Sequence, residues 1–299
     1  MTKKIFAAGY FGYGNFGDEL IRDIFISRMS AWSISSIPRM KTKPLSVFLS
    51  IAKSDAVVFP GGSVFQDETS TLSLFFYACV IFASALLSKP VFLLDSGFEV
   101  RKPLNKAILR MALKLTAFIS VRDSASFELL RALGLNPFKS ADCACSLKNF
   151  PCRHLVPPKT IGVIPRRKTG EVKEAISLCQ KKWPGAKFKF AVLSPGDMPS
   201  ARYLAGGGGG VLIKDMAGAE KFFAGCDFFI LTPFHSLVLA TVSGADFTAV
   251  TYSDKTANFM KDMDKLSSPN KRNRAELPRI AEECAFQIFL NLLKDKLKL

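Results

Sequence analysis

Histidine and tryptophan are scarce in this chain of 299 residues, with two of each, and acidic residues are outnumbered by basic ones, 25 to 41. The formal charge of +16 predicts anionic partners, which include nucleic acid, a membrane surface and a phosphorylated substrate. The sequence lacks zinc-finger spacing and any aromatic and basic segment of the RNA-recognition type, so we expect no nucleic-acid binding. The two histidines, His154 and His235, are therefore the first candidates for acid/base chemistry near neutral pH.

Long hydrophobic runs are also rare. Residues 71–88 contain no charge, but this run of 18 is shorter than the roughly 20 residues that span a bilayer. It contains several Ser and Ala residues, and Lys89-Pro90 and an apolar strand follow it. We therefore expect a buried helix, with a membrane span as the alternative. The N-terminus shows no signal-peptide pattern, which predicts a cytoplasmic protein.

The cysteines do not form a recognisable disulfide or zinc pattern. Their number is seven, which is odd, and without a secretory context they are expected to be reduced thiols. Cys143, Cys145, Cys152 and His154 cluster as C-x-C-x6-C-x-H, which is not a standard zinc spacing. We interpret them as small buried hydrophobic residues, and we expect neither a metal site nor a cofactor.

Short apolar strands alternate with helical segments along the whole chain, which is typical of parallel sheets with helices on both faces. The expected strands are residues 4–8, 56–59, 91–94, 118–121, 160–164, 188–193, 211–213, 228–231 and 247–251. The pattern lapses over residues 143–158, so we predict domains at 1–152 and 153–299. The fold class is α/β, with two Rossmann-like doubly wound domains facing a cleft. The last helix, residues 277–293, could return to the N-terminal domain.

One predicted helix carries a row of basic residues at every fourth position, namely Lys102, Lys106, Arg110 and Lys114. The apolar residues expected on its buried side are Ile108, Leu109, Met111, Ala112 and Leu115. The row is either a solvated surface or a surface that rests on anionic lipid headgroups, where each basic residue contributes about 1 kcal/mol.

A glycine-dense loop joins the first strand to the first helix. Gly12, Gly14 and Gly17 satisfy G-x-G-x-x-G, the dinucleotide fingerprint. The acidic ribose partner expected about 20 residues later is missing, because residues 35–41 read S-S-I-P-R-M-K. The acids lie inside the loop instead, at Asp18 and Glu19, where they could also cap the helix. We predict a phosphate- or sugar-bearing ligand, and NAD or FAD stays the weaker alternative.

A second loop, residues 60–70, reads P-G-G-S-V-F-Q-D-E-T-S. Together with N-F-G-D-E at residues 15–19, it resembles the polysaccharide pyruvyltransferase family, including enzymes that pyruvylate cell-wall polymers for S-layer anchoring. The segments S-V-R-D-S-A-S at 120–126, F-H-S-L at 234–237 and V-T-Y-S-D-K at 250–255 are similar to further family motifs. The chain departs from the family at Ser63, a family glycine, and at Pro233, where the family has an arginine thought to grip the donor.

The resemblance implies a GT-B-like fold and the transfer of pyruvyl from phosphoenolpyruvate to two sugar hydroxyls, giving a ketal and phosphate. That chemistry needs cations for the donor, a proton for its methylene carbon and a base for the hydroxyl. The implied catalytic residues are His235, Asp18 and Asp67. The implied donor-binding residues are Arg166, Arg167, Phe234 and Ser236. The implied acceptor-binding residues are Gly14, Asn15, Gly17, Glu19, Gly61, Gly62 and Gln66.

The implied acceptor is a cell-surface saccharide or its lipid-linked precursor. The implied location is the inner face of the plasma membrane, with an anionic membrane surface as partner. Two alternatives stay open. One is a GT-B glycosyltransferase that uses a nucleotide-sugar. The other is a catalytically impaired relative that only binds glycans or lipids, which Pro233 keeps in view.

Overall fold

The computed structural model covers the whole chain and describes residues 3–36, 44–68, 71–166, 169–251, 253–265 and 276–298. The chain forms two compact units. Unit 1 comprises Met1–Tyr13, Ile21–Cys143 and Pro278–Leu299, and unit 2 comprises Gly14–Leu20 and Ala144–Leu277. The units therefore differ from a single division after residue 152, because a short N-terminal segment belongs to unit 2 and the end of the chain belongs to unit 1.

Unit 1 is built on a seven-stranded parallel sheet with the order β2-β1-β3-β5-β6-β7, and β4 pairs with β5. Its strands are β1 (Lys4–Ala7), β2 (Ser33–Ser36), β3 (Ala56–Phe59), β4 (Gly62–Gln66), β5 (Val91–Glu99), β6 (Phe118–Val121) and β7 (Phe138–Lys139). Strand order reverses between β1 and β3. Ligands of open parallel sheets bind outside the carboxyl ends of the strands at such a point, and both glycine loops begin there.

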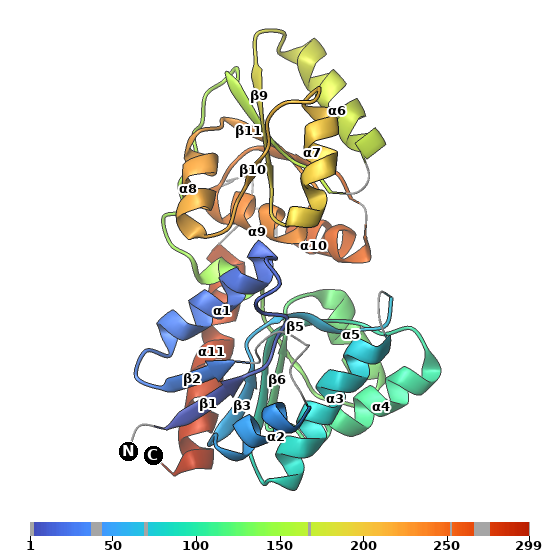
Figure 1. The fold of residues 1–299 in the computed structure, drawn as a ribbon, viewed down its shortest axis with the longest axis vertical. Helices are drawn as coiled ribbons and strands as arrows, with labels where there is room; N and C mark the ends of the chain where they lie inside the picture. The colour runs from blue at the N-terminus through green and yellow to red at the C-terminus, as the bar shows by residue number, and fades with distance from the viewer. Residues whose placement is uncertain are drawn as a thin grey trace. The chain divides into compact units, whose positions relative to one another are not determined.

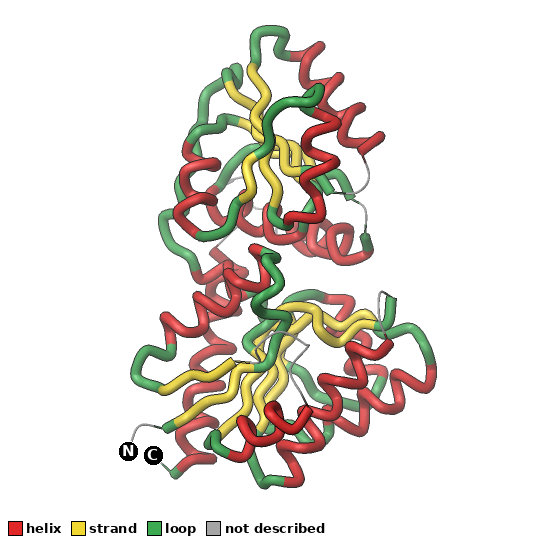
Figure 2. The backbone as a smooth tube through the Cα atoms, viewed as in Figure 1, coloured by secondary structure: helices red, strands yellow, loops and turns green. Residues whose placement is uncertain are grey.

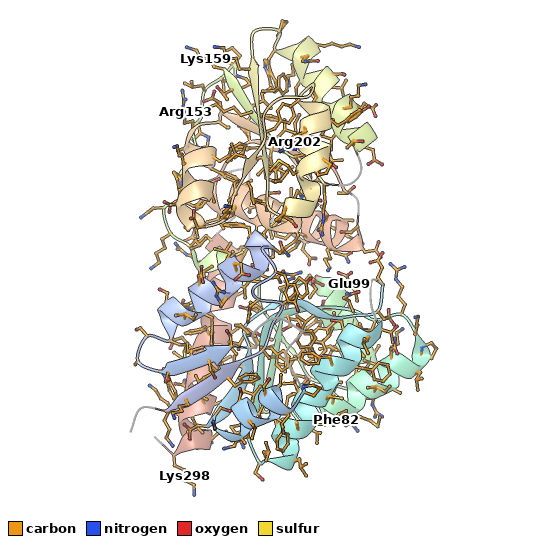
Figure 3. All side chains as sticks on the ribbon, viewed as in Figure 1. Phe82, Glu99, Arg153, Lys159, Arg202 and Lys298 are labelled. Atoms are coloured by element: carbon orange, nitrogen blue, oxygen red, sulfur yellow. The ribbon has the colours of Figure 1, made fainter. Side chains whose placement is uncertain are left out.

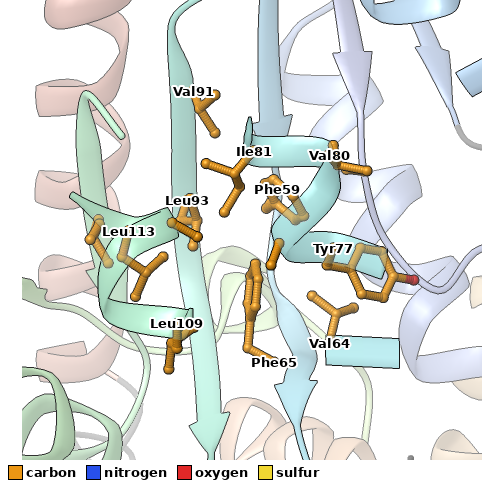
Figure 4. Packing of buried hydrophobic residues seen from close by; sticks show 14 of the residues in the cluster. Phe59, Val64, Phe65, Tyr77, Val80, Ile81, Val91, Leu93, Leu109 and Leu113 are labelled. Atoms are coloured by element: carbon orange, nitrogen blue, oxygen red, sulfur yellow. The ribbon is translucent and has the colours of Figure 1, made fainter. Parts of the chain in front are cut away.

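Helices cover both faces of this sheet (Figures 1 and 2). They are α1 (Phe16–Arg28), α2 (Pro44–Ala52), α3 (Thr71–Leu86), α4 (Pro103–Leu113), α5 (Ser124–Ala132) and α11 (Glu276–Leu297). One face packs α2 to α5 against β3 and β5 through a large aromatic and aliphatic core, part of which Figure 4 shows. The opposite face packs α1 and α11 through Phe25, Met29, Phe286 and Phe289.

Unit 2 has a five-stranded parallel sheet with the order β10-β9-β8-β11-β12. The strands are β8 (Thr160–Ile164), β9 (Lys187–Val192), β10 (Val211–Leu212), β11 (Phe228–Leu231) and β12 (Phe247–Ala249). The helices are α6 (Thr169–Lys182), α7 (Met198–Leu204), α8 (Met216–Ala224), α9 (Phe234–Ser243) and α10 (Asp254–Lys265), with 3-10 turns at Cys143–Ser146 and Pro195–Asp197. Strand order reverses between β8 and β11, which is the expected ligand position of this doubly wound sheet.

Three local expectations need correction. The third strand was expected at residues 91–94, but β5 continues to Glu99 because β4 pairs alongside its second half. Residues 62–66 of the second glycine loop form β4 itself. Met111 and Leu115 were expected to be buried, yet they are 54% and 47% exposed, whereas Leu109 and Ala112 face the core.

The uncharged segment forms α3, which packs on the sheet through Leu74, Tyr77 and Ile81. Among the described residues, the structure has no helix both long and apolar enough to cross a membrane. The outer side of α3 is not buried, since Leu72 and Leu86 are largely exposed.

Candidate functional site

The candidate site lies where three parallel strands of unit 2 end. Arg166 follows β8, the segment that begins at Leu193 follows β9, and Thr232 follows β11. Because β8, β9 and β11 are parallel, their carboxyl ends lie at one edge of the sheet. The edge includes the strand-order reversal between β8 and β11, so the topology itself favours this position for a ligand.

The first turn of α1 packs onto this edge. The backbone N–H of Phe16 donates to the carbonyl of Leu193 at 2.9 Å, and Gly14 lies beside Pro195. Gly14 has φ +74°, a left-handed conformation that favours glycine. The Asn15 amide donates to Asp18, and the backbone N–H of Glu19 donates to the Asn15 carbonyl at 3.1 Å. Asn15 and Asp18 thus fix the start of α1, and the positive end of a helix dipole suits an anion.

Gly17 and His235 occupy adjoining space in unit 2. A Cβ added to Gly17 would lie 2.0 Å from Nδ1 of His235 and 2.7 Å from its Cγ. The imidazole therefore rests against the bare backbone of α1, and any side chain at position 17 would displace it. His235 is half-buried in the first turn of α9 and meets the ring of Phe234 edge-on, with 5.3 Å between centroids. The motif glycine thus positions the candidate acid/base group.

The start of α9 lacks a side-chain cap. Pro233 occupies the N-cap, with φ −67° and ψ 142°. The Ser236 hydroxyl is buried and donates to the Pro233 carbonyl at 2.6 Å, and Phe234 packs against Phe259. These contacts give both residues a structural role, whereas their donor-binding assignment remains a prediction. Thr232 is fully buried, and its hydroxyl has no hydrogen-bond partner among the described residues. Sequence reasoning missed it, although its position at a strand end was a usable signal.

Of the two arginines assigned to donor binding, the structure describes Arg166. Arg166 is 42% exposed at its side chain, and its Nε lies 3.9 Å from Oδ2 of Asp197. Asp197 ends the 3-10 turn whose Pro195 touches Gly14, so Arg166 belongs to the same strand-end cluster as the α1 turn. Arg167 lies outside the described residues. Arg166 is the described arginine that could substitute for the cation missing at Pro233.

The other glycine loop belongs to unit 1. Gly61 and Gly62 have φ +139° and +87°, conformations that side chains rarely adopt. Gln66 ends β4, and the next residue, Asp67, accepts hydrogen bonds from the backbone N–H groups of Arg101 and Lys102. Burial works to raise the pKa of Asp67, but these backbone donors and the amide of Asn105 lower it below its usual value. The Asp67 carboxylate thus fixes the backbone that leads into α4, and its catalytic assignment remains a prediction.

Ser63, the departure from the family glycine, contacts a buried arginine. The Arg122 guanidinium donates to the Ser63 hydroxyl at 2.7 Å and to Asp142 at 2.8 Å. Asp123 is a distant partner of Arg122, at 3.9 Å, and caps α5 by accepting from Ser126. The ion pair that fixes this loop is therefore formed mainly by Arg122 and Asp142.

A buried carboxylate near these loops was not anticipated from the sequence. Asp95 lies in β5 with φ +45°, an uncommon conformation for a residue other than glycine. Its carboxylate accepts from the Ser120 hydroxyl at 2.9 Å. Burial raises the pKa of Asp95 to about 7, with Asp142 adding to the shift. Burial also raises the pKa of Glu282 on α11 to about 8, with Asp95 adding to it and Arg28 opposing it.

The cysteine cluster does not converge on a metal site. Cys143 and Cys145 are buried, whereas Cys152 donates to the Ser243 carbonyl at 2.9 Å and contacts His154 at 3.0 Å. Burial raises the pKa of the Cys152 thiol, which disfavours the thiolate that a metal would need. Within the described parts of the chain, no three His, Cys, Asp or Glu side chains are grouped to hold a metal ion.

The parallel sheets, the strand orders and the strand-end position of the candidate site define an α/β protein with a GT-B-like fold. The family model for polysaccharide pyruvyl transferase matches residues 4–254. The chain belongs to this family, and the family is one of transferases. The match includes both glycine loops and His235.

Two solved structures share the fold over nearly the whole chain. A UDP-GlcNAc 2-epimerase from Neisseria meningitidis, bound to UDP-GlcNAc, aligns with a TM-score of 0.56 at 12% identity and covers 97% of this chain and 100% of its own. A protein assigned as a UDP-N-acetylglucosamine 2-epimerase from Listeria monocytogenes aligns with a TM-score of 0.54 at 12% identity, over 99% of this chain and 97% of its own. No curated sequence matches the chain. At this identity the likeness concerns the fold alone.

Proposed function

We propose that this protein moves the pyruvyl group of phosphoenolpyruvate onto two hydroxyls of a sugar in a cell-surface polysaccharide or its lipid-linked precursor. In that reaction the methylene carbon gains a proton, both hydroxyl oxygens bond to the central carbon of the donor, and phosphate leaves. Family membership supports pyruvyl transfer to a polysaccharide. The packing of His235 against Gly17 at the strand-end edge is the observation that carries the site assignment.

His235 is the proposed acid/base group. Its imidazole lies where the N-termini of α1 and α9 meet in unit 2, and the positive ends of the two helix dipoles favour an anion there. Arg166 is the proposed additional donor contact, because a phosphate and a carboxylate need more positive charge than two helix ends supply. Gly61, Gly62 and Gln66 in unit 1 are the proposed acceptor residues.

The test is phosphate release from phosphoenolpyruvate in the presence of a panel of saccharide acceptors, with the ketal identified by mass. We expect release that depends on both substrates. His235→Ala should reduce it by at least about 100-fold, the usual contribution of a general acid/base. His154→Ala is the matched control, since His154 is exposed and lies beside Cys152. Wild-type turnover of the His235 variant would remove this residue from the site.

A nucleotide-sugar transferase is the second candidate, because one solved structure with this fold is bound to UDP-GlcNAc. Turnover only with nucleotide-sugars would establish this alternative. Binding of a glycan without turnover of either donor would instead identify a catalytically impaired relative. That outcome would agree with Pro233, which places an uncharged ring at the position of the family arginine.

The proposal includes a peripheral location at an anionic membrane surface, because a lipid-linked acceptor stays at the membrane. The basic row on α4 supports this location. Lys102, Arg110 and Lys114 are exposed, and Lys106 is half-buried.

A further inference from the structure

Three neighbouring helices of unit 1 expose apolar side chains on the side that faces away from the sheet. On α3, Leu72, Phe75, Cys79, Phe82 and Leu86 recur at helical spacing, and the terminal leucines are 75% and 79% exposed. Figure 3 labels Phe82 on this helix. A helix that only covers a sheet would present polar residues here, and no described residue buries the terminal leucines of this stripe.

The stripe continues onto the helices on both sides of α3. On α2, Leu45, Phe48, Leu49 and Ala52 are exposed at positions i, i+3, i+4 and i+7. On α4 and the turn that follows it, Leu104, Ala107, Met111 and Leu115 form the outer row, and Leu104 is 69% exposed. All three helices pack on the same face of the sheet, with α3 between α2 and α4 (Figure 1). We call these three outer rows the apolar face.

The charge that the three helices themselves carry is all positive. The sequences of α2, α3 and α4 contain no Asp or Glu. The basic row of α4 lies next to its apolar row, and Lys53 and Lys89 follow the ends of α2 and α3. At the end of the face, an open pocket of about 370 Å³ is lined by residues that include Lys89, Leu115 and Lys296.

An extended apolar surface rimmed by cations matches the interface of an anionic bilayer. Helices that lie in the membrane plane bury an apolar side among the acyl chains and keep basic residues at the headgroups. A second protein chain would need its own complementary apolar surface, whereas a membrane offers acyl chains and negative charge together. Lys89 and Lys296, which line the edge pocket together with Leu115, add positive charge at this end of the face.

We propose that the apolar face inserts in the headgroup and acyl boundary of an anionic membrane and holds unit 1 there as a monotopic protein. The inference deepens the membrane location in the proposed function, but it does not depend on pyruvyl transfer. It assigns α2 and α3, which carry no charge, as the inserted elements, in addition to the basic row of α4.

The experiment measures flotation of the full chain with vesicles of phosphatidylcholine that contain phosphatidylglycerol or lack it. The test variant combines Leu72→Gln, Leu86→Gln and Leu104→Gln. The matched control combines Leu178→Gln, Tyr203→Gln and Val211→Gln, three exposed apolar residues of unit 2. A charge variant combines Lys102→Glu, Lys106→Glu, Arg110→Glu and Lys114→Glu.

We expect the wild type and the control to float with phosphatidylglycerol vesicles, and the test variant to lose at least about tenfold in partitioning. High salt should weaken wild-type binding without abolishing it, because the apolar contribution is not screened. Loss of binding by the charge variant alone would indicate electrostatic adsorption without insertion and would overturn the proposal. Absent wild-type binding would overturn it too.

A wild-type dimer in lipid-free solution that the test variant converts to a monomer would show that a second copy covers the apolar face, which also contradicts the proposal. Turnover with a water-soluble acceptor separates the two proposals. A test variant that fails to float but turns over normally supports insertion, while flotation without turnover of any donor refutes only the proposed reaction.

Discussion

Replacement of Gly17 by alanine tests the central contact of the candidate site. The new Cβ would lie 2.0 Å from Nδ1, 2.6 Å from Cε1 and 2.7 Å from Cγ of His235, and these are its three nearest atoms. Ordinary contacts of a Cβ begin at 3.4 Å, so the imidazole or the first turn of α1 must shift by more than an ångström. A misplacement of about 1 Å can lower turnover roughly 100-fold.

The same substitution also has a predicted effect on the free energy of unfolding. Gly17 lies in α1 without a positive φ, so alanine alone would favour the helix by up to about 1 kcal/mol. With His235 present we expect the opposite, because overpacking of the alanine against the ring should lower the free energy of unfolding by about 1–3 kcal/mol. In a His235→Ala background the obstructing ring is gone, and Gly17→Ala should then be neutral or stabilising.

The assay is a double-mutant cycle followed by urea unfolding and by donor-dependent phosphate release. We expect a coupling energy of about 1–3 kcal/mol between the two positions. Gly170→Ala is the matched control, because Gly170 is also the second residue of a helix and an added Cβ there would meet nothing within 4 Å. Equal destabilisation by Gly17→Ala in both backgrounds, or full turnover of the single variant, would refute the assigned packing.

Three further predictions concern buried polar groups. Thr232→Val removes a fully buried hydroxyl without a described partner, so the free energy of unfolding in thermal melts should hold or rise; a clear loss of stability would show that the hydroxyl is hydrogen-bonded. Asp142→Asn leaves the buried Arg122 charge without its carboxylate, so it should lower the free energy of unfolding by about 3–5 kcal/mol in thermal melts. Asp123→Asn is the control, because asparagine can still cap α5, and its effect should be much smaller. The pKa of Glu282 is raised from 4.5 to about 8 in the folded state, so between these pH values the folded protein holds a proton that the unfolded chain has lost. The free energy of unfolding therefore falls as pH rises from 4.5 to about 8, and Glu282→Gln should make this fall less steep. An unaltered dependence on pH would contradict the assignment.

The sequence predicted much of the fold because local patterns decide it. The strands at residues 160–164 and 228–231 were expected at the bounds that β8 and β11 have, since each is a short apolar run between polar or helical segments. Met111 and Leu115 of the α4 region were wrongly expected to be buried. Apolar residues surround most of that helix, and periodicity alone cannot tell which of two apolar rows packs on the sheet.

The candidate site depends on contacts that no local pattern contains. His235 was expected from its motif, but its neighbour Gly17 is more than two hundred residues away in the sequence. The assignment of Gly14–Leu20 to unit 2 could not be predicted, because a strand, a glycine loop and a helix ordinarily stay in one domain. Thr232 and Asp95 were missed because burial and backbone conformation, not residue type, make them unusual.

The fingerprint of three glycines acquires a different explanation from this packing. In dinucleotide-binding proteins the third glycine of G-x-G-x-x-G allows close contact of the helix with its own sheet. Here the third glycine is Gly17, and the space beside it is occupied by the imidazole of His235 in unit 2. The second glycine, Gly14, lies beside Pro195 of the same unit. The spacing therefore reflects the need to bring the start of α1 against an imidazole. For this reason the motif supports an anion site built around His235 more strongly than it supports a dinucleotide.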